Sequence, residues 1–159
     1  MKKLWCTSFI EFEQIAIENN WDKEVPNDIA IISINYSNLV ENERHICKSD
    51  TNILNLNFDD VDPTTYGLSE DESCYIDDDI ILVFFTNEMA KQVVEFIETN
   101  KNKNFYIHCS AGISRSQAIV KYIKNVYYEY DWKTNPNNPC LYPNGFVFQK
   151  LKQAYRKRL

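Results

Sequence analysis

A cysteine, a glycine and an arginine lie within seven consecutive residues of the segment FYIHCSAGISRSQAIV, 105–120. The apolar residues before Cys109 predict a short strand, and the run after Arg115 predicts a helix, so a loop joins them at a helix N-terminus. Such a loop can point successive backbone N–H groups inward and bind an anion. Gly112 permits the positive φ that a tight loop needs. The planar guanidinium of Arg115 can bind two phosphate oxygens at once.

Cys109 adds a nucleophile to this loop. Helix N-termini and nearby cations favour the thiolate, which is the reactive form of a cysteine. A nucleophile, an anion-binding loop and a bidentate cation together indicate phosphoryl transfer through a cysteinyl-phosphate intermediate. The alternative is a cysteine that packs at a strand end and an arginine on an exposed helix start. Five specified residue types at fixed spacing argue against that alternative.

The segment HCSAGISRS resembles the signature HCxxGxxR(S/T) of the protein tyrosine phosphatase superfamily. The resemblance implies that Cys109 is the nucleophile, that Arg115 binds phosphate, and that Ser116 helps the thiolate leave in the second step. His108 stands where the family has a histidine that helps to set the loop. The phosphate-binding residues that the resemblance implies are Ser110, Ala111, Gly112, Ile113, Ser114 and Arg115. It implies no metal and no other cofactor.

The family also uses an aspartate, on a mobile loop after an upstream strand, to protonate the leaving oxygen. NLNFDDVDP, 55–63, matches that setting. In relatives with a similar pair of aspartates the second one serves, which points to Asp60. Asp59 and Asp62 are the alternatives, and each could instead be an ordinary loop carboxylate. Asp60 lies farther before Cys109 than in compact dual-specificity phosphatases, because an acidic segment of about 64–79 intervenes.

The segment YPNGFVFQKL, 142–151, resembles the dual-specificity pattern in which an asparagine opens the last helix. The simplest role of Asn144 is that of a helix cap. In relatives this asparagine also helps to hold the phosphate loop. The resemblance covers about residues 29–155. The tyrosine-recognition segment of the large receptor-type domains has no counterpart here, so a shallow pocket of the dual-specificity kind is expected.

The elements that must position these residues alternate along the chain. Helices are predicted at 8–19, 86–100, 116–131 and from 144 or 145 to about 155, and strands at 29–35, 53–58 and 105–108. A capping box at Ser8 and Glu11 and a cap at Thr86 mark two of the helix starts. Loops are predicted at 37–44, 59–79 and 133–143. This alternation predicts one α/β domain, 1–159, with a mostly parallel central sheet flanked by helices and the phosphate-binding loop between a strand and a helix.

Composition limits the partners and the compartment. The chain has 159 residues and a net charge of -6, which argues against nucleic acid or an anionic membrane as the main partner. Five cysteines, none in a CxxC pair, argue against a disulfide framework and a zinc site and favour the cytoplasm. Glu11 and Glu13 interrupt the N-terminal apolar run, so no signal peptide is predicted. No apolar run approaches the roughly 18 residues of a membrane span.

These observations predict a small, metal-free phosphatase for phosphotyrosine in proteins, with phosphoserine and phosphothreonine left open. A phosphatase of RNA 5′-phosphates or phosphoinositides would use the same chemistry. It fits less well, because the loop carries no lysine and acidic surroundings repel a polyanion. A catalytically silent phosphopeptide-binding module is the alternative if the general acid is absent. Rhodanese-type sulfur transfer also uses a loop cysteine, but the spacing here is that of the phosphatases.

Overall fold

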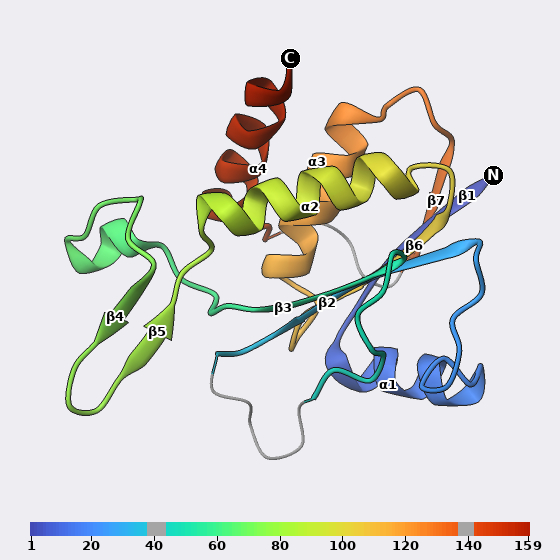
Figure 1. The fold of residues 1–159 in the computed structure, drawn as a ribbon, viewed down its shortest axis with the longest axis horizontal. Helices are drawn as coiled ribbons and strands as arrows, with labels where there is room; N and C mark the ends of the chain where they lie inside the picture. Colours follow the sequence, from blue (N-terminus) through green and yellow to red (C-terminus); the bar gives the residue numbers. More distant parts are fainter. Residues whose placement is uncertain (38–43, 137–141) are drawn as a thin grey trace.

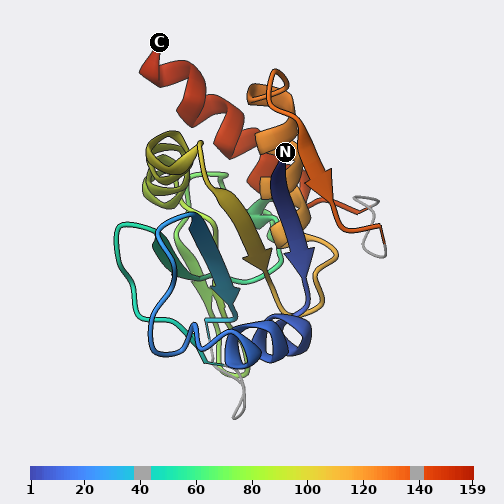
Figure 2. The same ribbon diagram turned by 90° about the vertical axis from the view of Figure 1, so that its right-hand side faces the viewer.

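The computed structural model describes residues 1–37, 44–136 and 142–159, and these form a single α/β domain. Five parallel strands form the central sheet in the order β3-β2-β6-β1-β7 (Figures 1 and 2). The strands are β1 (Lys2–Thr7), β2 (Ile29–Asn35), β3 (Ile53–Asn57), β6 (Asn104–His108) and β7 (Trp132–Thr134). The predictions of an α/β fold and a mostly parallel sheet are confirmed.

Helices cover both faces of this sheet. The four helices are α1 (Phe9–Glu18), α2 (Asn87–Asn100), α3 (Arg115–Val126) and α4 (Gly145–Arg158). One face carries α1 and the other carries α2, α3 and α4 (Figure 1). Three helix starts follow the predicted caps, because the side chains of Ser8, Thr86 and Asn144 each accept a hydrogen bond from a first-turn N–H.

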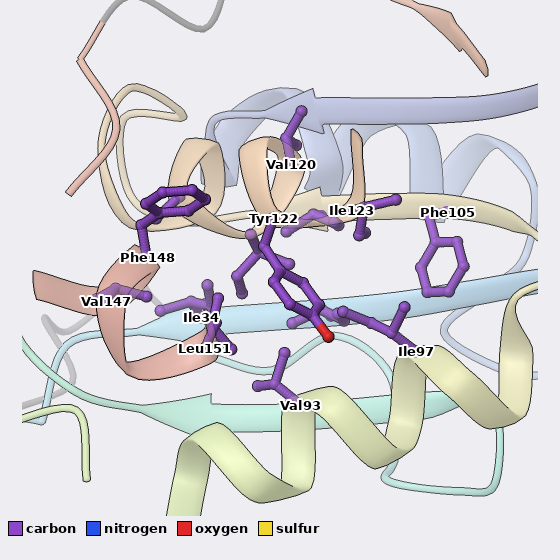
Figure 3. Close-up of a cluster of buried hydrophobic side chains, with 14 of the residues drawn as sticks. Ile34, Val93, Ile97, Phe105, Val120, Tyr122, Ile123, Val147, Phe148 and Leu151 are labelled. Atoms are coloured by element: carbon purple, nitrogen blue, oxygen red, sulfur yellow. The ribbon is translucent and has the colours of Figure 1, made fainter. Parts of the chain in front are cut away.

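The main core lies between the sheet and the three-helix face (Figure 3). Side chains of α2, α3 and α4 meet there with residues of β2 and β6; those labelled in the figure are Ile34, Val93, Ile97, Phe105, Val120, Tyr122, Ile123, Val147, Phe148 and Leu151. All are buried. Because β6 and α3 are both fixed in this core, the loop that joins them is held at its two ends.

Two strands of the sheet are absent from the sequence prediction. The segment KKLWCT forms β1, which pairs with β6 on one side and β7 on the other. Leu4 and Cys6 alternate with Trp5 and Thr7, so the strand has two different faces. The segment WKT forms β7, whose three residues are too few to show a period. Both strands depend on long-range pairing rather than on local pattern.

Helix α3 ends at Val126, five residues before the predicted end at residue 131. The next residues make aromatic contacts that a continued helix would break. Trp132 Nε1 donates to the Tyr127 carbonyl at 3.1 Å, and the Tyr130 ring lies between those of Tyr127 and Trp132. Tertiary packing therefore overrides the helical spacing of this segment.

The acidic segment is more ordered than the predicted loop. It contains the 3₁₀ helix η1 (Pro63–Tyr66) and a hairpin of β4 (Cys74–Ile76) and β5 (Ile81–Val83). The hairpin stands at the edge of the molecule, apart from the central sheet (Figure 1). Residues 38–43 and 137–141 of the predicted loops at 37–44 and 133–143 lie outside the described residues, and the second loop begins in β7 instead, which includes Lys133 and Thr134. Among the described residues, no helix is long and apolar enough to cross a membrane.

Candidate active site

Cys109 directly follows β6, and six residues separate His108 at the end of that strand from Arg115 at the start of α3. The Cys109 thiol is almost fully buried, with the residue 2% exposed. Its Sγ accepts a hydrogen bond from the Gly112 amide at 3.2 Å and lies 3.1 Å from Ser116 Oγ. The sulfur thus contacts a backbone amide on the side of the loop and a hydroxyl on the side of the helix.

Gly112 fastens this loop to the junction between β1 and α1. Its φ is +74°, a conformation that residues with a side chain rarely adopt. A Cβ at this position would lie 2.6 Å from the carbonyl carbon of Thr7, which is too close for any side chain. The Phe9 amide adds a hydrogen bond to the Ser110 carbonyl at 3.1 Å. The loop therefore has a fixed shape against β1.

Arg115 is almost fully buried, with the residue 2% exposed, and its guanidinium group is held by three contacts. One Nη donates to the Phe58 carbonyl at 2.7 Å, and the other donates to Ser110 Oγ at 3.1 Å. The Tyr36 ring lies 4.3 Å from the guanidinium carbon. The Nε is buried and has no hydrogen-bond partner among the described residues. A buried, unsatisfied cationic donor beside a bent loop is suited to an incoming oxyanion.

Ser116 connects Cys109 to a second cysteine. The Cys6 thiol donates to Ser116 Oγ at 3.0 Å, and the Ser116 hydroxyl can then donate to Cys109 Sγ. Both residues are fully or almost fully buried. Sequence reasoning missed Cys6 because it did not predict β1. The consecutive apolar residues Leu4, Trp5 and Cys6 are the signal that could have placed it.

Asp60 contacts the rim of the loop. Its Oδ1 accepts hydrogen bonds from Ser114 Oγ at 2.7 Å and from Asn144 Nδ2 at 2.8 Å. Asn144 also caps α4, because its Oδ1 accepts a hydrogen bond from the Val147 backbone amide. The backbone amide of Asn144 donates to the Ser114 carbonyl at 3.0 Å. Asn144 therefore both opens the helix and ties the loop to Asp60, as the two suggested roles require.

The other two candidate aspartates are engaged elsewhere. Asp59 is buried and accepts from the Ser37 amide, the Ser37 hydroxyl and the Val83 amide at 3.1, 2.7 and 2.7 Å. Asp62 caps η1 by accepting from the Thr64 amide at 2.9 Å. Of the three candidates, Asp60 is the one with a contact to the loop among the described residues.

His108 lies beneath the loop and is fully buried. Its ring stacks on Phe12 at 4.5 Å between centroids. Nδ1 lies 3.3 Å from the Cys109 carbonyl oxygen, and Nε2 lies 2.6 Å from Ser33 Oγ. Burial lowers the pKa of His108 to about 3, so the ring is neutral at physiological pH. It acts on the Cys109 main chain and not on the sulfur.

An acidic groove of about 640 Å³ extends from the loop rim. Its lining includes Asp60, Asp62 and Glu70, together with Ser114 and Phe146. No lysine or arginine is among the described residues that line it. The space beside the loop thus combines hydrogen-bonding groups, an aromatic side chain and three carboxylates.

The structure brings Cys109, Arg115, Ser116, Asp60 and His108 to one loop and its surroundings. The predicted cradle residues 110–114 form that loop, with Ile113 half exposed at its surface. Cys6, Tyr36 and Phe58 are additions that the sequence did not indicate. No protein-family model matches the chain, and no curated protein matches it significantly.

Proposed function

We propose that the chain is a phosphoric monoester hydrolase that removes phosphate from phosphotyrosine in proteins through a cysteinyl-phosphate intermediate, with phosphoserine and phosphothreonine as further substrates. The observation that carries this proposal is one loop with two features: the Cys109 sulfur lies within hydrogen-bond distance of the Gly112 amide and the Ser116 hydroxyl, and the buried Arg115 has an Nε without a partner among the described residues. The cysteine usage supports action in the reducing cytoplasm.

In the first step the Cys109 thiolate attacks phosphorus and the ester oxygen leaves. Arg115 binds two non-bridging oxygens, and the loop amides bind the developing negative charge. Asp60, at the rim, donates a proton to the leaving oxygen. The products are the free alcohol or phenol and a phosphorylated Cys109, with Asp60 now ionised.

In the second step a water molecule attacks phosphorus and the S–P bond breaks. The Asp60 carboxylate accepts the proton of that water, which restores its acid form. The departing sulfur accepts a hydrogen bond from the Ser116 hydroxyl, whose oxygen is in turn bonded by the Cys6 thiol. Inorganic phosphate is released and the thiolate is regenerated.

The acidic groove supports a protein substrate with basic residues near the phosphorylated side chain. Three carboxylates line the groove, and the nearby hairpin segment adds further carboxylates. An RNA or a phosphoinositide would bring more negative charge into this field, which opposes binding. Exposed charges are screened beyond about 8 Å at physiological salt, so the preference is strongest at low salt.

The purified chain should hydrolyse a phosphotyrosyl peptide flanked by arginines faster than one flanked by glutamates, with the ratio of kcat/KM shrinking as salt is added. Chelators should leave the rate unchanged, whereas thiol alkylation should abolish it. Alkylation is best tested in a Cys74→Ser background, because Cys74 is an exposed thiol in the hairpin. Loss of activity with a chelator, restored by metal, would overturn the cysteine mechanism. Equal turnover of both peptides at low salt would instead show that the acidic groove does not select basic peptides, and it would leave the cysteine mechanism unaffected.

Asp60→Asn should slow phenyl phosphate strongly and an activated fluorinated aryl ester only slightly. A good leaving group departs without a proton, whereas general acid catalysis contributes about 10²–10⁴-fold for a poor one. The measurement is kcat/KM across a series of aryl phosphates, read as the slope against leaving-group acidity.

Asp59→Asn is the matched control, since it makes the same change one residue away. Asp59 accepts three hydrogen bonds from Ser37 and Val83, so its loss should lower the free energy of unfolding by about 2 kcal/mol. It should leave the leaving-group slope unchanged. A steeper slope in the Asp59 variant and not in the Asp60 variant would reverse the two roles.

A further inference from the structure

A continuous chain of polar contacts runs from the catalytic loop across the sheet. His108 Nδ1 lies 3.3 Å from the Cys109 carbonyl oxygen, and its Nε2 lies 2.6 Å from Ser33 Oγ. The same Ser33 oxygen lies 2.8 Å from His45 Nδ1, and His45 Nε2 lies 2.8 Å from Asn57 Oδ1. We call this set the histidine chain. It contains both histidines of the protein.

Both ends of the histidine chain are hydrogen-bond acceptors. At one end is the backbone carbonyl of Cys109. At the other end the orientation of the Asn57 amide is fixed, because its Nδ2 donates to the Tyr36 carbonyl at 3.1 Å and leaves Oδ1 facing His45. Every proton in the chain must therefore come from the two imidazoles and the Ser33 hydroxyl.

The number of protons does not match the number of contacts. Four contacts need four protons, but two neutral imidazoles and one hydroxyl supply three. With both rings neutral, His45 donates to Asn57, Ser33 donates to His45, and His108 Nε2 donates to Ser33. The Cys109 carbonyl then faces the lone pair of His108 Nδ1. We assign the missing proton to this contact because, at 3.3 Å, it is the longest of the four.

One additional proton completes all four hydrogen bonds, and His45 is the place for it. His108 is fully buried, and burial lowers its pKa to about 3, which excludes that ring. His45 is only half-buried and contacts the uncharged Ser33 from β2 and Asn57 from β3. Among the described residues, Arg44 is the charged chain neighbour of His45, and Arg115 and His45 each contribute to lowering the pKa of His108.

We propose that His45 is a positioning residue for the catalytic loop, which acts by taking up a proton and switching the tautomer of His108 through Ser33. With His45 charged, its Nδ1 donates to Ser33, and the Ser33 hydroxyl turns to donate to His108 Nε2. The single His108 proton then resides on Nδ1 and is donated to the Cys109 carbonyl. No bond forms or breaks apart from these proton shifts.

This switch links protonation of His45 to the geometry of the nucleophile. The completed hydrogen bond fixes the Cys109–Ser110 peptide at the start of the loop. Its kinetic consequence rests on the proposed function, but the tautomer change does not. The two can therefore fail separately.

The direct test is ¹⁵N nuclear magnetic resonance of the two histidines across pH, on the intact chain. As pH falls, His45 should become an imidazolium, and His108 should change from the Nε2–H to the Nδ1–H tautomer over the same pH range while staying neutral. A single His108 tautomer throughout the titration of His45 would overturn the proposal. So would a change of His108 that persists in His45→Gln.

Asn57→Asp offers a second test that keeps both histidines. A carboxylate beside His45 favours the imidazolium, so both transitions should move together to higher pH by about one unit or more. Asn55→Asp is the matched control on the same strand, because Asn55 bonds the Cys47 carbonyl and Ser49 instead. If Asn57→Asp moves only the His45 transition, the coupling through Ser33 is absent and the proposal fails.

The kinetic readout is the pH profile of kcat/KM for phenyl phosphate. His45→Gln should lower kcat/KM about fivefold at the acid end of the transition, which is the worth of one ordinary hydrogen bond, and by less at the alkaline end. An unchanged profile, with the tautomer switch present, would show that the switch does not influence catalysis. No phosphatase activity in the wild type would remove the proposed function and leave the resonance result standing.

Discussion

Cys109→Ser should abolish turnover while the protein still binds inorganic phosphate. A serine hydroxyl is neutral at pH 7 and is a poor nucleophile without an adjacent base, so kcat should fall at least about 10³-fold. Phosphate binding should survive because Phe58 and Ser110, not the sulfur, hold the Arg115 guanidinium, and Gly112 packs against the Thr7 main chain. Single-turnover kinetics measure the first effect, and calorimetric titration with inorganic phosphate measures the second.

Cys74→Ser is the control for this substitution. Cys74 is an exposed cysteine in the hairpin, so the same chemical change there should leave kcat and phosphate affinity unchanged. Substantial activity in Cys109→Ser would show that the nucleophile lies elsewhere. Loss of phosphate binding in that variant would show instead that the thiolate itself organises the loop.

Arg115→Lys should fail almost as severely although the charge is kept. The guanidinium uses both Nη atoms to hold Phe58 and Ser110 and keeps Nε free, whereas an ammonium is a single point that cannot meet these demands at once. The expected loss is about 10²–10³-fold in kcat, comparable to the removal of one donor from an oxyanion hole.

The measurement is kcat and KM for an aryl phosphate beside the same substitution at Arg156, an exposed residue of α4. Arg156→Lys should behave as wild type. Turnover near the wild-type rate in Arg115→Lys would exclude bidentate binding as the function of the buried arginine. A thermal unfolding curve separates this loss from simple destabilisation, because the guanidinium also packs on Tyr36.

Local patterns were sufficient for most of the scaffold. The helices and central strands could be predicted because their signals lie in neighbouring residues. Examples are the caps at Ser8 and Thr86 and the β-branched run of β2. The loop between β6 and α3 could be predicted for the same reason, because Cys109, Gly112 and Arg115 lie within seven consecutive residues. Strands β1 and β7 were missed because their stability comes from pairing with distant strands.

The sequence pointed to Asp60 as the candidate acid only through the family resemblance, because Asp59 and Asp60 are adjacent. Only the contacts of each side chain separate them: Asp59 turns to Ser37 and Val83, and Asp60 turns to Ser114 and Asn144. The histidine chain was equally hidden. No local pattern points to Ser33, His45 or Asn57, because these residues lie far apart in the sequence. Only the folded structure brings them into contact.

The place of β1 in the sheet sets a condition on how the protein is made. This interior strand is synthesised well before its two neighbours in the sheet, which begin only at Asn104 and Trp132. At about 20 residues per second the segment waits about 5 seconds before it can pair. During that wait both of its edges are free to bind other nascent chains. Lys2 and Lys3 place two positive charges at the start of this strand, which disfavours such association. The thiol of Cys6 can reach Ser116 only after more than 100 further residues have been made, so this contact beside Cys109 forms long after β1 is synthesised.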